Sequence, residues 1–255
     1  MSQLEVDNVG VHFGGVVALD GLSFSIEKGQ ICALIGPNGA GKTTLFNVIS
    51  RIYDATTGSV TFEGTDLLKA APHQIAHLGL GRTFQNLALV PGLSVLDNVK
   101  IGAHSRSKAG FWTSTLRMPQ VIKEERQLTQ QALDILGRLS LADLAERPCA
   151  GLPFGTLKRI EFARALASDP KLLMLDEPAS GLTHGEVDEL GELIQQIRDE
   201  FQLTVLLVEH HMAMVMSISE KVVVMDLGRK IAEGVPDQVR NDPLVIAAYL
   251  GAPAK

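Results

Sequence analysis

The chain has 255 residues, of which 45% are hydrophobic, and this is enough apolar material for a packed globular core. Its formal net charge of −6 argues against a protein that grips phosphate backbones by charge, so we predict no nucleic-acid partner. No apolar run approaches the roughly 20 residues that cross a bilayer, and the N-terminus lacks a secretory pattern, so we expect a cytoplasmic location.

The first predicted elements are strands with one buried face. Val9, Val11 and Phe13 are spaced by two residues, and the same spacing places apolar side chains at Leu22, Phe24 and Ile26. Alternation of this kind is typical of strands that are apolar on one face only. We therefore predict antiparallel strands at the start of the chain.

Continuous apolar runs at residues 31–35, 171–175 and 204–208 follow along the chain. An apolar run without alternation suits a strand of a parallel sheet that is covered on both faces. These three runs are the predicted core of the main sheet. Residues 222–233 contain two further strand-like segments around a turn-like centre, which predicts a hairpin.

Strand signals fade in the middle of the chain. Residues 121–139 mix Gln and charged side chains with leucines at helical spacing, which predicts a helix. Residues 105–119 are basic and loop-like and contain the only tryptophan. We predict a mostly helical insertion over residues 87–163, within an α/β core that comprises residues 1–86 and 164–255.

A glycine-rich phosphate-binding pattern follows the first buried run. Residues 36–43 fit the order Gly, four variable residues, Gly, Lys and then Ser or Thr, between a predicted strand and a predicted helix. Gly39 and Gly41 let backbone N–H groups turn toward phosphate oxygens, and the helix N-terminus adds its positive dipole. Lys42 is expected to reach the β and γ phosphates, and the Thr43 hydroxyl to bind Mg²⁺. The predicted nucleotide-binding residues of this loop are Gly36, Pro37, Asn38, Gly39, Ala40, Gly41, Lys42, Thr43 and Thr44.

Two carboxylates end the second buried run. Asp176 and Glu177 stand where a parallel strand reaches its carboxyl end, and open α/β sheets bind their ligands at this edge. Beside a phosphate loop, Asp176 is suited to bind Mg²⁺, and Glu177 to orient and deprotonate the attacking water as a general base.

These motifs, in this order, resemble the nucleotide-binding subunits of ABC transporters over essentially the whole chain. The resemblance implies an α/β P-loop NTPase fold with a parallel sheet core, an N-terminal antiparallel β subdomain and an inserted helical subdomain. It also implies that Phe13 stacks on adenine, that Gln85 contacts Mg²⁺ and senses the permease, and that His210 is the switch histidine at the γ phosphate. Thr183 stands where the family's subunit-coupling loop commonly ends in Asp.

The signature segment departs from the family consensus Leu-Ser-Gly-Gly-Gln. Only Leu152 and Gly155 match. Pro153 offers neither the hydroxyl that the family serine directs to the partner's γ phosphate nor a backbone N–H, so we expect one contact to be missing. A proline followed by an aromatic residue resembles the branched-chain amino acid importer branch. The residues predicted to face the ATP of a partner subunit are Leu152, Pro153, Phe154, Gly155 and Thr156.

The resemblance implies ATP and Mg²⁺ as cofactors and places the chain on the inner face of the cell membrane. It implies a second ATP-binding subunit, identical or paralogous, integral membrane permeases and a solute-binding protein in the full system, which would import branched-chain or related amino acids. Two alternatives stay open. One is another transporter branch, such as urea or amide import or lipopolysaccharide export, and the other is a soluble ABC ATPase that acts on ribosomes or DNA.

Some of these residues also have simpler structural explanations. The alternation of Phe13 with its apolar neighbours fits burial in the core as well as adenine stacking. Residues 87–93 fit either core packing or a groove that receives a permease helix. Cys32 and Cys149 lack metal-site spacing and are expected to be reduced and structural.

Overall fold

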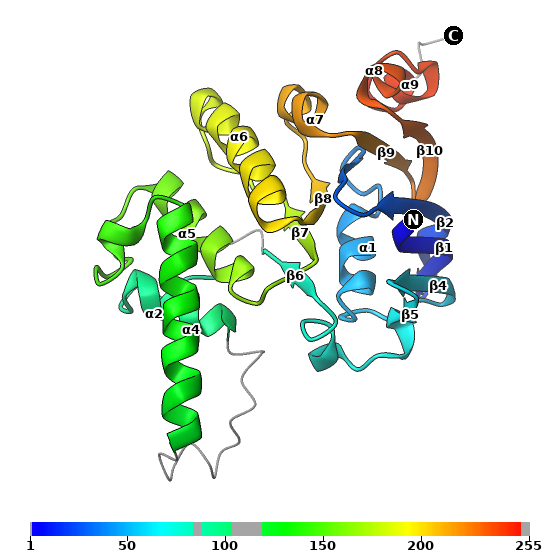
Figure 1. Cartoon of the computed structure of the whole chain (residues 1–255). Helices are drawn as coiled ribbons and strands as arrows, with labels where there is room; N and C mark the ends of the chain where they lie inside the picture. Colours follow the sequence, from blue (N-terminus) through cyan, green and yellow to red (C-terminus); the bar gives the residue numbers. More distant parts are fainter. Residues whose placement is uncertain (1, 84–87, 104–118, 251–255) are drawn as a thin grey trace. The chain divides into compact units, whose positions relative to one another are not determined.

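The structure of the chain is a computed structural model that describes residues 2–83, 88–103 and 119–250 (Figure 1). It contains two compact units. The core unit combines Met1–Arg82 with Lys171–Lys255, and the helical unit comprises Thr83–Pro170. No helix in the described residues is both long enough and apolar enough to span a membrane.

The core unit contains two β-sheets, five α-helices and two short 3-10 helices, Leu67–Lys69 and Pro72–Gln74, among its described residues. Its strands are β1 (Ser2–Phe13), β2 (Val16–Glu27), β3 (Ile31–Ile35), β4 (Thr57–Phe62), β5 (Thr65–Asp66), β6 (Leu80–Arg82), β7 (Leu172–Asp176), β8 (Thr204–Val208), β9 (Lys221–Asp226) and β10 (Arg229–Gly234). Its helices are α1 (Lys42–Ile49), α6 (His184–Phe201), α7 (Met212–Ile218), α8 (Pro236–Arg240) and α9 (Pro243–Leu250).

The smaller sheet is antiparallel, with the strand order β2-β1-β4-β5. Val6 of β1 pairs with Phe24 of β2 on one side and with Val60 of β4 on the other, and all three side chains are buried. The predicted antiparallel strands are confirmed. The structure adds β4 and β5, which the sequence analysis did not predict.

The larger sheet has the order β10-β9-β3-β8-β7-β6. Strands β9, β3, β8, β7 and β6 pair in parallel, and β10 pairs with β9 in an antiparallel hairpin. The three predicted core strands are therefore adjacent in the sheet as β3, β8 and β7, and the predicted hairpin is confirmed. The short strand β6 at the sheet edge was not predicted.

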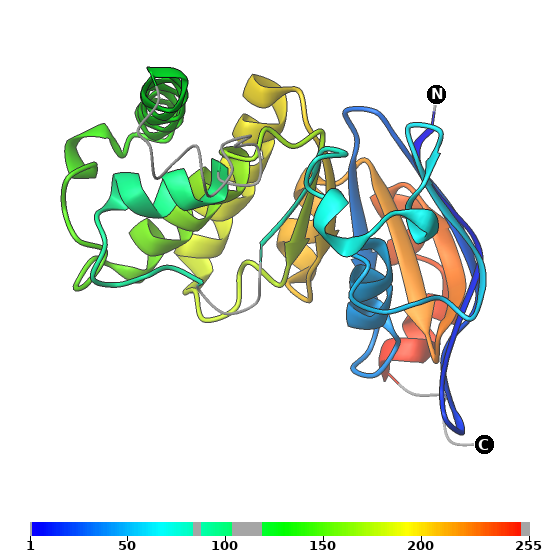
Figure 2. The same cartoon turned by 90° about the horizontal axis from the view of Figure 1, so that it is seen from below.

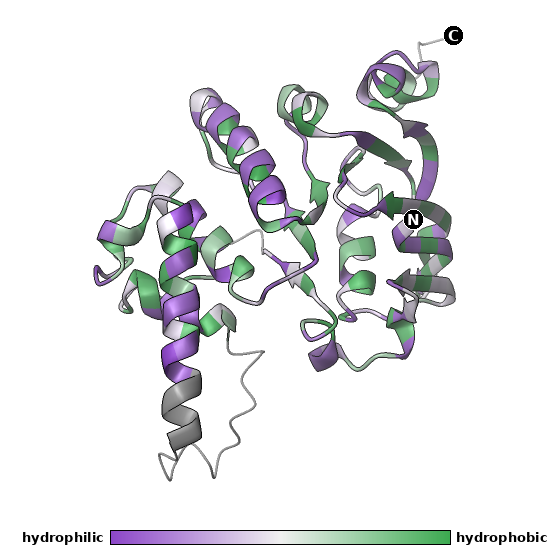
Figure 3. Cartoon of the chain, viewed as in Figure 1, coloured by the Kyte–Doolittle hydropathy of each residue, from purple (hydrophilic) through white to green (hydrophobic). Residues whose placement is uncertain are grey.

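Both faces of the larger sheet are covered, which explains its continuous apolar strands. Cys32 and Leu34 of β3 belong to a core shared with α1 and the antiparallel sheet. Ala33 and Ile35 face the opposite way and pack with side chains of α7, α8 and α9. In Figure 3 the strands of this sheet have mostly hydrophobic colours, whereas α6 carries both hydrophobic and hydrophilic residues.

The helical unit is built from α2 (Val95–Ala103), α4 (Pro119–Arg138) and α5 (Phe154–Leu166). In Figures 1 and 2, α2 and α5 lie side by side and α4 runs across them. Buried side chains recur at helical spacing, for example Leu136 and Leu139 near the end of α4 and Ile160 and Ala163 on α5. The helix predicted at residues 121–139 is confirmed.

Candidate functional site

The predicted catalytic residues follow three neighbouring strands of the parallel sheet. The phosphate loop (residues 36–44) follows β3, Asp176 ends β7 with Glu177 after it, and His210 lies two residues beyond β8. Since β3 pairs with β8 and β8 pairs with β7, all in parallel, their carboxyl ends meet at one edge of the sheet. Residues far apart in the sequence thus converge on one site within the core unit.

Close backbone approaches shape the phosphate loop. Gly36 has a φ of +153°, and a Cβ placed on it would overlap the carbonyl oxygen of Met225. Gly41 has a φ of +97°, and its Cβ would lie 2.6 Å from the carbonyl oxygen of Ala18. Gly41 is the N-cap of α1, and because glycine has no side chain, it leaves the first N–H groups of that helix without a side-chain cap. A glycine loop that leads into an uncapped helix N-terminus supplies the donors that phosphate oxygens need.

Lys42 is the cation of this loop. Its Nζ donates to the carbonyl oxygens of Gly36, at 2.6 Å, and Pro37, at 3.0 Å. Burial lowers the pKa of the Lys42 ammonium, whereas the charges of Glu177 and Asp176 raise it. The Lys42 amine therefore lies near the carboxylates of the site. Its present partners are two loop carbonyls, whose places phosphate oxygens could take.

Asp176 is buried against an arginine that the sequence analysis missed. Arg82 ends β6, and its Nη2 donates to Asp176 Oδ2 at 2.9 Å. Its Nη1 donates to Asn47 Oδ1 at 2.9 Å and to Ser50 Oγ at 3.1 Å. The guanidinium also lies 5.5 Å from the ring centroid of Phe46. Arg82 thereby ties the end of β7 to the helix that follows the phosphate loop.

The environment of Asp176 predicts a stabilising substitution. Burial raises the pKa of Asp176, although the hydrogen bond and charge of Arg82 lower it. An acid with a raised pKa in the folded state binds protons more tightly there, so its ionisation costs stability as the pH rises past its unfolded pKa. Asp176→Asn keeps an oxygen that can accept from Arg82, and we expect it to raise the Tm of the nucleotide-free chain by about 2 °C near pH 8.

Calorimetry at several pH values checks this expectation. The difference in Tm between Asp176→Asn and the native chain should shrink as the pH falls from the raised pKa of folded Asp176 toward the unfolded pKa of aspartate, about 3.9, because below both values the native carboxyl is neutral in both states. A lower Tm for the variant near pH 8 would show that the ion pair with Arg82 outweighs the cost of burial.

Glu177 has an unusual backbone conformation. Its φ is +48°, in the left-handed region, which costs a residue with a side chain about 1 kcal/mol. Two hydrogen bonds hold it there, because its N–H donates to the Val208 carbonyl at 2.9 Å and its own carbonyl accepts from the Ser180 N–H at 3.1 Å. The half-buried Glu177 side chain is therefore carried by a backbone that is fixed to the end of β8.

His210 presents its ring to solvent beside a buried carboxylate. Its side chain is 60% exposed, and its Nδ1 lies 3.7 Å from Glu209 Oε2. The ring of His211 lies 4.8 Å away between centroids. Among the described residues these three form a group that could hold a metal ion, but both Glu209 oxygens already accept backbone N–H bonds, so we assign no metal there.

Residues 19–180 of the chain match the ABC transporter family, and residues 229–255 match a family described as branched-chain amino acid ATP-binding cassette transporter. The chain belongs to the ABC transporter family. It is 39% identical over 248 residues to the high-affinity branched-chain amino acid transport ATP-binding protein BraF of Pseudomonas aeruginosa, with 97% of each chain covered. It is 38% identical over 253 residues to LivG of Escherichia coli K12, a protein of the same description, with 98% of this chain and 99% of that one covered.

Solved structures of ATP-binding cassettes share the fold. A nucleotide-free cassette from an ABC transporter is 32% identical, with a TM-score of 0.85, over 98% of this chain and 100% of that one. A cassette in its ADP conformation is 34% identical, with a TM-score of 0.86, over 98% and 99% of the two chains. The fold class expected from the resemblance is confirmed, and nucleotide binding by a related cassette is consistent with the phosphate loop described above.

Phe13 of this ABC transporter chain is not a core residue. Its side chain is 46% exposed at the end of β1, although Val9 and Val11 on the same strand are buried. The burial that its alternation suggested is wrong, because the pairing of β1 with β2 shifts register between Val11 and His12. Phe13 instead contacts Tyr53 edge to face, with centroids 5.1 Å apart. Its exposed ring is available to a ligand, and adenine stacking stays a prediction.

Two further residues that the resemblance singled out have different outcomes. Gln85 lies outside the described residues. Thr183 is the N-cap of α6, and both its N–H and its hydroxyl donate to the Glu186 carboxylate, at 2.8 Å and 2.7 Å. Its hydroxyl is therefore already used within its own helix.

The signature segment starts a helix in the helical unit. Pro153 is the N-cap of α5 and makes no side-chain capping bond, while its carbonyl accepts from the Leu157 N–H at 3.0 Å. Phe154 is 40% exposed, and the Lys158 Nζ lies 5.8 Å from its ring centroid. Leu152, Gly155 and Thr156 are half-buried. The amino end of α5 keeps its dipole but lacks the hydroxyl of the family serine.

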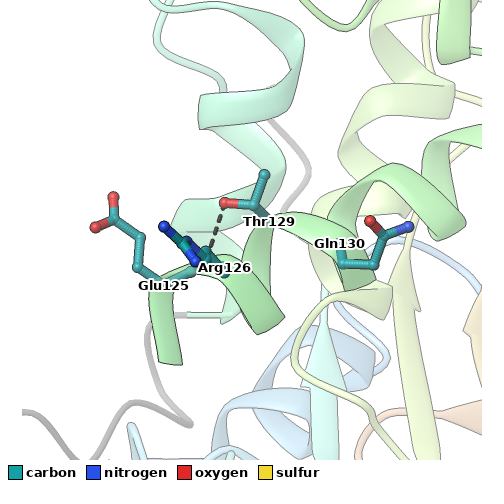
Figure 4. A pocket seen from close by; sticks show the side chains of 4 residues that line it. All are labelled: Glu125, Arg126, Thr129 and Gln130. Carbon is teal, nitrogen blue, oxygen red and sulfur yellow. Dashed lines mark hydrogen bonds between the residues drawn. The ribbon is translucent and has the colours of Figure 1, made fainter. Parts of the chain in front are cut away.

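Apolar side chains near the start of the helical unit are exposed. Val90 is 44% exposed and Leu93 is 37% exposed. Core packing is therefore wrong for these two residues of the 87–93 segment, and the permease groove stays a prediction. A separate open hollow is lined by Glu125, Arg126, Thr129 and Gln130 of α4 (Figure 4). This hollow contains none of the predicted site residues.

Proposed function

We propose that this ABC transporter chain is the ATP-hydrolysing subunit that powers import of branched-chain or related amino acids through partner permeases. The observation that carries the proposal is the convergence of the phosphate loop, Asp176, Glu177 and His210 at one edge of the parallel sheet. The substrate class is supported by the names of the relatives and by the match of residues 229–255.

The side chains and backbone groups that the chain offers at this site fit MgATP. Phe13 offers a ring face to adenine, and the N–H groups of the phosphate loop, except at Pro37, with the Lys42 amine are assigned to the phosphates. The Thr43 hydroxyl and the Asp176 carboxylate, with Gln85, are hard oxygen ligands of the kind that Mg²⁺ prefers. When bound, Mg²⁺ would neutralise charge on the β and γ phosphates.

Hydrolysis is assigned to residues at the ends of β7 and β8. As the water oxygen forms its bond to the γ phosphorus, Glu177 accepts a proton from that water, the bond from the γ phosphorus to the β–γ bridging oxygen breaks, and ADP and inorganic phosphate leave. Two backbone hydrogen bonds fix the main chain that carries the Glu177 carboxylate. His210, with its exposed ring, contacts the γ phosphate, and Lys42 stabilises the charge that develops on the phosphate oxygens.

The site is completed by other proteins. The signature, Leu152 to Thr156, faces ATP bound by a second ATP-binding subunit, identical or paralogous, in a head-to-tail pair. Permeases hold the chain at the inner face of the membrane and contact the exposed apolar residues Val90 and Leu93. The insertion at residues 87–163 then carries both contacts, and a solute-binding protein delivers the substrate.

The proline in the signature predicts a gain of activity. Pro153→Ser supplies a side-chain oxygen at an N-cap that now has none, which stabilises the helix by about 1 kcal/mol. It also restores a hydroxyl that can reach the partner's γ phosphate. We expect the ATPase rate of the assembled transporter to rise roughly 3-fold, because this change corresponds to the net free energy that one added hydrogen bond contributes. Pro153→Ala, which lacks the hydroxyl, is the control, and equal rates for the two variants would contradict the interpretation.

Isolation of the tagged chain from its native cells tests the proposed function. We expect it to copurify with integral membrane permeases and a second ATPase, and the reconstituted complex to couple ATP hydrolysis to uptake of a branched-chain amino acid. Uptake of urea or amides instead would place the chain in another transporter branch. Recovery of ribosomes or DNA without a membrane partner would overturn the transporter assignment.

A further inference from the structure

Glu209 is a buried carboxylate at the end of β8 that the proposed chemistry does not use. Glu209 is 1% exposed. Oε1 accepts the Ala179 N–H at 2.8 Å, and Oε2 accepts the N–H groups of His210, at 2.8 Å, and His211, at 3.1 Å. A buried charge is costly unless it is satisfied in this way.

The partners of Glu209 belong to two different loops. Ala179 lies in the segment that leads from Glu177 to Thr183 and into α6, after β7. His210 and His211 lie in the segment between β8 and α7. One oxygen serves each loop, so a single side chain joins the loop that starts at the predicted general base to the loop that carries the predicted switch histidine.

The need for two acceptor oxygens explains why residue 209 is a glutamate. A glutamine has the same shape but only one acceptor oxygen, and its NH₂ group would meet backbone N–H groups in one of the two loops. An apolar residue would leave all three backbone donors without this acceptor inside the protein. Only a carboxylate with the reach of glutamate accepts from both loops at once.

We propose that Glu209 is a positioning residue. It holds the segment that leads from Ala179 to Thr183 and the segment that contains His210 together, so that the two segments move as one body. The γ-phosphate contact of His210 is then transmitted to the loop that couples the subunits. This inference rests on the proposed function, because it requires His210 to contact the γ phosphate of bound ATP.

Glu209→Gln tests the proposal in the assembled transporter with MgATP. We expect kcat to fall on the order of 10-fold, a typical effect of removing a partner that orients a catalytic group. KM for ATP should change less than about 2-fold, since the phosphate loop is untouched. The matched control is Glu220→Gln, because Glu220 also accepts a backbone N–H, from Ile31 at 2.6 Å, but at the amino end of β3. The control should retain the native kcat.

Two further variants separate positioning from a general loss of stability. If Glu209 acts through His210, the double variant Glu209→Gln with His210→Ala should be no slower than His210→Ala alone. Glu209→Asp is shorter by one methylene and cannot reach both loops, so kcat should again fall. Native kcat in Glu209→Asp, or multiplicative losses in the double variant, would overturn the proposal. Failure of the proposed function is distinguishable, because the native assembled transporter itself would then show no hydrolysis that depends on Glu177.

Discussion

Glu177→Gln is expected to lower the ATP turnover of the chain by about 100- to 1000-fold, the range that a general base contributes. The amide has the shape of the carboxylate but cannot take a proton from water at neutral pH. The backbone bonds to Val208 and Ser180 that hold the left-handed conformation involve no side-chain atom of Glu177, so the fold around the site should persist. ATP affinity should therefore remain within about 2-fold of the native value.

Single-turnover hydrolysis and titration with a fluorescent ATP analogue measure the two quantities separately. Glu189→Gln is the matched control, because Glu189 is an exposed glutamate on α6 that has no part in the proposed site. A Glu177→Gln variant that hydrolyses ATP at the native rate would show that Glu177 is not the general base.

The strands that could be predicted are those that a contiguous run of apolar residues marks in the sequence. Residues 31–35 and 204–208 are apolar at every position or nearly so, because both faces of the sheet are covered there, and they form β3 and β8. β6 contains only Leu80–Arg82, too short for a periodic pattern, and it exists because it pairs with β7. Such an edge strand depends on tertiary pairing that sequence periodicity does not record.

The same distinction applies to the site. The phosphate loop, Asp176 and Glu177 could be predicted because a contiguous pattern specifies each of them. Arg82 and Glu209 could not, since Arg82 meets Asp176 across 94 positions of sequence and Glu209 meets Ala179 across 30. The signal for Glu209 was a carboxylate directly after a strand that is apolar except at Thr204, because a charge at such a position needs backbone donors around it.

Lys42→Met is expected to weaken ATP binding by roughly 100-fold, the equivalent of one or two charge-assisted hydrogen bonds at about 1.5–3 kcal/mol each. Methionine keeps most of the length of the side chain and removes its charge. Among the described residues, Lys42 Nζ donates to the Gly36 and Pro37 carbonyls of its own loop. Gly36 and Pro37 are half-buried residues, so we expect water to replace the amine at their carbonyls and the Tm of the variant to fall by only a few degrees.

Equilibrium titration with MgATP and with MgADP distinguishes a phosphate contact from a structural one. Lys171→Met is the matched control, because Lys171 pairs with Glu63 on the surface of the same unit. If Lys42 meets the β and γ phosphates, its loss should weaken MgATP binding more than MgADP binding, since ADP lacks the γ phosphate. Equal losses for the two nucleotides would confine Lys42 to the β phosphate, and native affinity for both would show that Lys42 only braces the loop. Glu177→Gln is expected to lower turnover while ATP affinity is kept, so the pair of variants separates binding of the γ phosphate from the attack of water on it.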